Sequence, residues 1–231
     1  MTMNNQSTDI MLDILEQCKE DGKIPHPKED HTRFLMANGM GQKKEDGWLV
    51  SREERIDISM ALMAEGVDAE KVVQHMTWKD FEGLVAGILE RNGYRCIESF
   101  RRIGNEEIEG MEIDVIGVKE RKILSVDAKM WGIRKGKASA LKSAAEDQFD
   151  RTERLGNHLD TVSQKIGGLE PGDYELTPVL VTWFVEDIQF HEGIPMVPVF
   201  KLNSFVLELD RYHSLIKHLE GSFKGGQQTL Q

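Results

Sequence analysis

Charged side chains interrupt two adjacent segments that otherwise favour β-strands. The stretch EIDVIGVKERKILSVDAKMW, residues 112–131, carries Asp114, Asp127 and Lys129 among apolar and β-branched residues. Asp is depleted in strands, and a buried charge is costly unless it is paired or bound to a metal. Carboxylate oxygens suit Mg²⁺ or Mn²⁺, and a neighbouring lysine could orient an attacking water or hold a phosphate. These residue types therefore indicate metal-assisted hydrolysis.

The spacing within this stretch predicts a hairpin with a charged face. Side chains alternate between the two faces of a strand, and a four-residue loop at 119–122 would place Asp114 opposite Asp127. The same register places Glu112 opposite Lys129. Facing carboxylates repel each other, so either one of them is protonated or a divalent cation lies between them. A solvated ladder of ordinary surface charges is the structural alternative.

The elements that would position this hairpin alternate between helices and strands. Residues 76–94 form the clearest helix, with Thr77 and Asp80 as a capping box and Asn92-Gly93 as the stop signal. The expected elements that follow are strands at 94–103, 112–118 and 123–130, a helix at 137–159, strands at 177–185 and 194–200, and a closing helix at 203–219 that carries His213 and His218. The tail from 221 is expected to fray.

The N-terminal part is expected to be mainly helical. Helices are predicted at 8–20, 52–66 and 68–76, and the Gly- and Pro-rich segment 21–47 reads as an irregular connection. The predicted domains are therefore a helical region at 1–75 and a main domain at 76–231. The two short helices fit a plain helical hairpin better than a DNA-reading helix-turn-helix.

The motif and the order of elements resemble the PD-(D/E)xK nuclease superfamily, in particular Mrr-like restriction endonucleases and archaeal Holliday-junction resolvases. An Asp on one strand and Asp-x-Lys on the next (Asp127, Ala128, Lys129) match the family motif, as does the tryptophan after the lysine in AKMW. The resemblance covers about residues 76–210. It implies an α/β fold with a restriction-endonuclease-like αβββαβ core, in which helices flank a mixed central sheet, preceded here by an α-helical N-terminal segment.

The resemblance also implies roles for individual residues. Asp114 and Asp127 match the two metal-binding acids, Lys129 matches the catalytic lysine, and Glu82 matches the helix glutamate of Mrr-like members. Glu112 has no secure counterpart and is a candidate supplementary ligand or partner of Lys129. Side chains that would approach DNA phosphates are Arg134, Lys135, Lys137, Lys142, Gln148 and Arg151.

Charge and composition limit the other function classes. The formal net charge of −11 argues against a nucleic-acid binder, yet residues 121–142 hold seven basic side chains against one acid. The sequence has no 18-residue apolar run, no signal peptide and only two cysteines, far apart, which predicts a cytoplasmic protein that does not enter a membrane. Neither a P-loop nor a GxSxG motif occurs.

The function predicted from the sequence is Mg²⁺- or Mn²⁺-dependent endonucleolytic hydrolysis of DNA, of the restriction or junction-resolving kind. A single such site cuts one strand, so cleavage of both strands would call for a homodimer. The alternative is a catalytically silent nuclease-fold module that binds nucleic acid or a protein partner. A third possibility is a charge ladder that only stabilises the fold of an unrelated protein.

Overall fold

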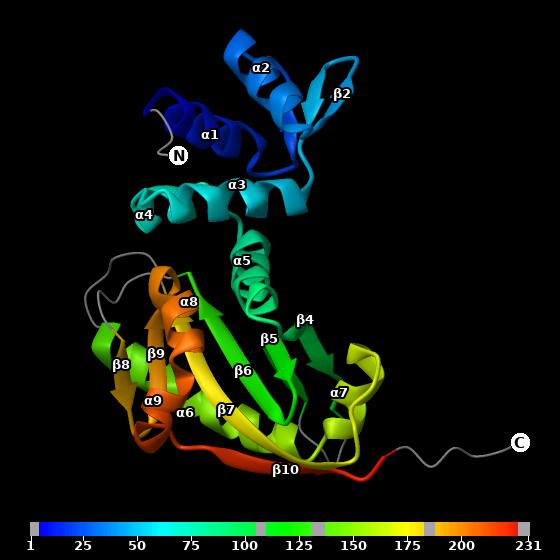
Figure 1. The fold of residues 1–231 in the computed structure, drawn as a ribbon, viewed down its shortest axis with the longest axis vertical. Coiled ribbons are helices and arrows are strands. Elements are labelled where there is room, and N and C mark those ends of the chain that lie inside the picture. The colour runs from blue at the N-terminus through cyan, green and yellow to red at the C-terminus, as the bar shows by residue number, and fades with distance from the viewer. Residues whose placement is uncertain (1–4, 105–109, 131–136, 183–187, 226–231) are drawn as a thin grey trace, which may run out of the picture. The chain divides into compact units, whose positions relative to one another are not determined.

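The computed structural model describes residues 5–104, 110–130, 137–182 and 188–225, and forms two compact units, 1–84 and 85–231 (Figure 1). The boundary falls within helix α5 (Trp78–Arg91). The division into a helical region at 1–75 and a nuclease-like domain at 76–231 stays a prediction. Among the residues that the structure describes, no helix has the length and apolar character needed to cross a membrane.

The first unit contains the expected N-terminal helices and a small sheet that the sequence did not suggest. Its elements are α1 (Asn5–Cys18), β1 (Lys23–Ile24), α2 (Glu29–Asn38), β2 (Gln42–Lys44), β3 (Gly47–Leu49), α3 (Arg52–Ala64) and α4 (Ala69–Val73). The prediction of an irregular segment at 21–47 is wrong, because this segment folds into α2 and the sheet β1-β3-β2. Buried Leu35 anchors α2, and buried His31 lies 2.8 Å from the carboxylate of Asp13. That long-range pair has no local sequence signal.

Capping interactions begin the helices where the sequence predicted them. The backbone N–H of Asp80 donates to Thr77 Oγ1, and the N–H of Thr77 donates to Asp80 Oδ2, which confirms the capping box of α5. Asp80 is also buried and lies 2.9 Å from the guanidinium of Arg55. One carboxylate thus begins a helix and balances a largely buried cation.

The double role of Asp80 predicts a large effect on stability. We expect Asp80→Ala to lower the free energy of unfolding by about 3–5 kcal/mol, because Arg55 would keep a buried and uncompensated charge. Asp68→Ala is the matched control, since Asp68 caps α4 at an exposed site and its loss should cost only about 1 kcal/mol. Urea denaturation followed by circular dichroism measures both. Equal effects of the two variants would show that the Arg55–Asp80 pair adds nothing beyond the cap.

The second unit is built on a seven-stranded mixed sheet. Its strands are β4 (Arg95–Arg102), β5 (Met111–Lys119), β6 (Lys122–Lys129), β7 (Gly172–Thr182), β8 (Gln189–His191), β9 (Ile194–Pro198) and β10 (Leu219–Phe223). The strand order is β4-β5-β6-β7-β9-β8, with β10 also paired to β7. The pairs β6–β7 and β7–β9 are parallel, and the other pairs are antiparallel.

Helices flank this sheet as predicted. They are α6 (Lys137–Gly156), α7 (Leu159–Ile166), α8 (Val199–Leu207) and α9 (Leu209–Tyr212). In Figure 1, α6 lies behind the sheet and α8 in front of it. The mixed α/β class and the order α5-β4-β5-β6-α6 are therefore confirmed, and the additional helix α7 precedes β7. Apolar side chains of β5 and β6, such as Ile116 and Ile123, pack with Leu155 of α6 and Leu159 of α7 in one buried cluster.

The end of the chain differs from the prediction of one closing helix and a frayed tail. Helix α8 gives way to the short α9 and then to the 3₁₀ turn η1 (His213–Leu215), and residues 219–223 form β10 along β7. His218 is therefore not on a helix. The segment 203–219 has apolar spacing that suits a helix, but pairing with a strand more than forty residues earlier leaves no local signal.

Candidate functional site

The β5–β6 hairpin forms with the predicted register but with a tighter turn. Val118 pairs with Ile123, as the predicted loop length requires, and Lys119 also pairs with Lys122. The four-residue loop is therefore wrong, because only Glu120 and Arg121 form the turn, with Glu120 in the left-handed region at φ 53°. The tighter turn leaves the faces of both strands unchanged.

The strand ladder ends just before the two aspartates. Its last pair toward the site is Val115 with Val126, so Asp114 and Asp127 do not form the predicted ladder pair. Asp114 Oδ2 instead accepts a hydrogen bond of 2.8 Å from the backbone N–H of Ala128. The Asp114 carboxylate thus binds the main chain of β6 at the point where the ladder of backbone pairs ends.

Asp127 lies at the centre of a buried charged group. It is 1% exposed, and its Oδ1 accepts a hydrogen bond of 2.9 Å from Arg151 Nη1 on α6. Lys129 Nζ lies 3.0 Å from Asp127 Oδ2, but this contact lacks the geometry of a hydrogen bond, and Oδ2 is buried without a hydrogen-bond partner among the described residues. Two cations thus balance the charge of Asp127, while one of its oxygens keeps unused acceptor capacity.

A buried glutamine of α6 holds the neighbouring part of β6. Gln148 is fully buried, and its Nε2 donates to the backbone oxygen and to the hydroxyl of Ser125 at 2.7 and 2.9 Å. Its Oε1 is buried and has no hydrogen-bond partner among the described residues. The sequence suggested Gln148 and Arg151 as phosphate contacts, whereas here they contact Ser125 and Asp127. Gln148 lies on the same buried face of α6 as Leu141 and Ala145. A polar residue at helical spacing from two apolar ones is the sequence signal that could have indicated a buried, structural Gln148.

The remaining predicted site residues lie in different settings. Glu112 is exposed, and its carboxylate lies 2.7 Å from the guanidinium of Arg101 on β4. The ladder between β5 and β6 ends at Val115 and Val126, so Glu112 does not pair with Lys129 as predicted. Glu82 is buried on α5, with Lys79 Nζ 3.0 Å from its Oε2. Because Glu82 belongs to the first unit, its role beside the strand carboxylates stays a prediction. Lys142 is exposed on α6. Arg134 and Lys135 lie outside the described residues, as does the side chain of Lys137.

The described residues also contain two groups of His and carboxylate side chains that could hold a metal ion. One consists of Glu175, His213 and His218, and the other of Glu146, His191 and Glu192. Within each group the candidate ligand atoms lie within 4.8 Å of one another. Neither group includes Asp114 or Asp127. Neither group has a local sequence signal, because its members come from separate elements of the fold.

The Asp114–Asp127 pair fits a divalent cation in the chemistry of its donors. Both carboxylates are nearly buried, they belong to neighbouring strands, and Asp127 Oδ2 has acceptor capacity left. Mg²⁺ commonly uses one or two protein carboxylates and completes its shell with water and substrate phosphate. Arg151 and Lys129 would have to share Asp127 with such an ion.

The chain is similar in sequence to one curated protein. No family model matches the chain. An uncharacterized protein from Archaeoglobus fulgidus is 30% identical over 137 residues, which are 59% of this chain and 95% of that protein.

Two solved structures show distant likeness. Protein VC1899 from Vibrio cholerae gives a TM-score of 0.36 at 12% identity over 91% of this chain, and Can2 from Sulfobacillus thermosulfidooxidans, in complex with cyclic tetra-adenylate, gives 0.33 at 10% over 90%. The chain spans about half of each, 51% in both cases. Similarity at this distance carries no functional argument. The relative that the chain covers almost end to end is the informative one, and this chain belongs to the same protein family as the uncharacterized protein of Archaeoglobus fulgidus.

Proposed function

We propose that the chain is a Mg²⁺- or Mn²⁺-dependent endonuclease that hydrolyses phosphodiester bonds of DNA. The observation that carries the proposal is the buried Asp127, whose Oδ2 faces Lys129 and has no hydrogen-bond partner among the described residues. A carboxylate oxygen can accept more than one contact, so Oδ2 can bind a cation beside its ion pair with Lys129. Asp114 supplies a second carboxylate from the adjacent strand.

In this proposal each residue of the site has a separate task. Asp114 and Asp127 would hold the cation, which when bound supplies an activated water and offsets negative charge on the phosphate. Lys129 orients the water and stabilises charge that develops at the scissile phosphate. Arg151 fixes the orientation of Asp127 through Oδ1, and Gln148 fixes β6 through Ser125. Glu82 is the proposed additional acid, and Glu112 remains a candidate supplementary ligand.

The direct test of this function is cleavage of a panel of DNA substrates. Linear duplex, supercoiled, single-stranded and four-way-junction DNA are incubated with the protein and Mg²⁺, Mn²⁺ or EDTA. We expect cleavage of at least one form with Mg²⁺ or Mn²⁺ and none with EDTA. Binding of DNA without cleavage under every metal condition would contradict the proposal.

That contradicting result would favour the second candidate, a silent module that binds nucleic acid or a protein. The observation in its favour is the double pairing of Asp127 with Arg151 and Lys129, which leaves a site that is electrically balanced without metal. The net charge of −11 points the same way. A silent module would still bind DNA without cutting it, so DNA affinity and DNA cleavage must be measured on the same substrates.

The basic residues 134, 135 and 137 provide a prediction about DNA affinity. We expect the combined variant Arg134→Ala, Lys135→Ala and Lys137→Ala to bind every DNA sequence more weakly by a similar factor. The slope of log affinity against log salt should flatten by up to about 0.9 for each phosphate that is no longer neutralised by a basic side chain. Fluorescence anisotropy between low and physiological salt measures the slope. Lys43→Ala with Lys44→Ala, at exposed positions of β2, is the control. An unchanged slope in the triple variant would make these residues ordinary surface charges.

A further inference from the structure

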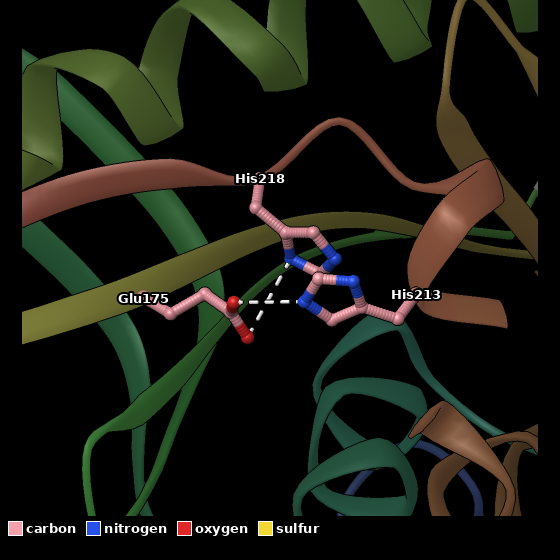
Figure 2. A group of neighbouring side chains, drawn as sticks. All are labelled: Glu175, His213 and His218. Carbon is pink, nitrogen blue, oxygen red and sulfur yellow. Dashed lines mark hydrogen bonds and ion pairs between the residues drawn. The ribbon is translucent and has the colours of Figure 1, made fainter. Parts of the chain in front are cut away.

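Three side chains from separate elements converge on the side of β7 that carries β10. Figure 2 shows Glu175 of β7, His213 at the start of η1, and His218 just before β10 pointing toward one another. His213 Nε2 lies 3.2 Å from Glu175 Oε2, and His218 Nδ1 lies 3.7 Å from Glu175 Oε1. The two imidazole rings stack with their centroids 4.3 Å apart.

The fold holds these side chains in place through main-chain contacts. Leu219 pairs with Leu176 and Glu220 with Glu175, which places His218 beside Thr177 at the start of β10. The N–H of Lys217 donates to the backbone oxygen of Gly193 at 2.9 Å, so the turn between η1 and β10 is anchored. The cluster is therefore partly preorganised, which lowers the entropic cost of binding a ligand there.

This cluster is separate from the proposed nuclease centre. In the parallel pairing of β6 with β7, Glu175 lies opposite Lys122, whereas Asp127 lies opposite Leu180. The two positions are five residues apart along the strands, which corresponds to about 16 Å at a rise of about 3.3 Å per residue. A ligand at Glu175 therefore cannot be shared with Asp127.

We propose that Glu175, His213 and His218 bind one Zn²⁺ ion. Two imidazole nitrogens and one carboxylate are a ligand set that zinc uses, with a fourth position left for water, whereas Mg²⁺ prefers oxygen ligands alone. Zn–N and Zn–O bonds of about 2.0–2.2 Å place neighbouring ligands of a tetrahedron about 3.4 Å apart. The observed separations of 3.2 and 3.7 Å lie on either side of that value, although they run to different oxygens of Glu175. One ligand atom from each of the three residues lies within 4.8 Å of the other two, so side-chain rotations would bring them to bonding distance of one ion.

A metal ion that binds to this cluster would displace one existing hydrogen bond. Thr177 Oγ1 lies 3.0 Å from His218 Nδ1, and the metal would replace that hydrogen bond. Lys122 is the neighbouring cation, and its ion pair with Asp210 at 2.7 Å offsets part of its repulsion of the metal. Bound zinc would tie the chain between η1 and β10 to β7.

The test is zinc binding by the full-length protein after treatment with EDTA and removal of the chelator. Isothermal titration calorimetry should give one Zn²⁺ per chain with micromolar or tighter affinity, and Co²⁺ should give the visible absorption of a tetrahedral site. His213→Gln and Glu175→Gln should each weaken binding at least tenfold. His213 is more than half exposed, so its replacement leaves the fold intact. Zinc should raise the melting temperature of the wild type but not of these variants.

Control variants identify which residues bind the zinc. His26→Gln alters an exposed histidine of the first unit and should bind zinc as the wild type does. His191→Gln tests the other histidine cluster and should also leave zinc affinity unchanged. Absence of stoichiometric binding, or binding that survives both His213→Gln and Glu175→Gln, would overturn the proposal. These outcomes do not depend on DNA cleavage, so they are distinct from failure of the proposed function.

Discussion

Asp127→Asn and Asp114→Asn are each expected to abolish metal-dependent DNA cleavage. An amide keeps the size of the carboxylate but removes the charge that a divalent cation needs, so the cation would lose one of its two anionic ligands. Both side chains are buried, and Asp127 is also the partner of Arg151 and Lys129. Cleavage of the preferred substrate with Mg²⁺, followed on gels over time, measures the loss.

The comparison for this pair is Glu112, the candidate supplementary ligand, which lies on the same strand as Asp114. Glu112→Gln alters an exposed residue of β5 that pairs with Arg101, and it should retain most of the activity. If Glu112→Gln were as inactive as Asp127→Asn, Glu112 would be a ligand in its own right. Circular dichroism and melting curves show whether each variant is folded. A folded Asp114→Asn or Asp127→Asn variant with wild-type cleavage would contradict the site assignment.

Lys129→Ala is expected to reduce the cleavage rate by about 10²–10³ with little change in the affinity for metal or DNA. The ammonium lies 3.0 Å from Asp127 Oδ2 and about one-fifth of the side chain is exposed, so it can reach a phosphate beside the carboxylates. Its removal leaves both proposed metal ligands in place but takes away a positive charge near developing negative charge. Single-turnover kinetics separate this rate effect from binding.

Lys122→Ala provides the matched control for Lys129, because it removes a lysine from the opposite end of the same strand. Its partner is Asp210, on an exposed surface, and cleavage should be unaffected. If Lys129→Ala weakens DNA binding in proportion to cleavage, Lys129 is a phosphate anchor. If it unfolds the protein, its pairing with Asp127 is structural and the catalytic role loses its support.

The local elements were predictable where the signal lies in neighbouring residues. Strand-forming residues on both sides of KERK predicted the hairpin and the Val118–Ile123 register. The same holds for the capping box of Thr77 and Asp80, since its members are three residues apart. The turn at Glu120 was predicted too long, because a left-handed Glu carries none of the Gly or Asn signal of tight turns.

The contacts that define the site depend on packing that one sequence does not reveal. Alternation predicted which strand face carries Asp127 and Lys129, but not that Arg151 would approach Asp127 from α6. The break in the ladder at Asp114 follows from a side chain that binds a main-chain N–H, an arrangement that pairing rules do not include. The Glu175 cluster depends on β10, which pairs with β7 from Leu219 onward, beyond the helical residues 199–215.

The most direct test of the nuclease centre is Mn²⁺ binding, followed by electron paramagnetic resonance, in variants that separate the two proposed metal sites. We expect the wild type and His213→Gln to bind Mn²⁺ with similar affinity, and Asp127→Asn to lose this binding while it remains folded. Mn²⁺ affinity that is unchanged in Asp127→Asn, or that is lost only in His213→Gln, would contradict a metal centre at Asp114 and Asp127.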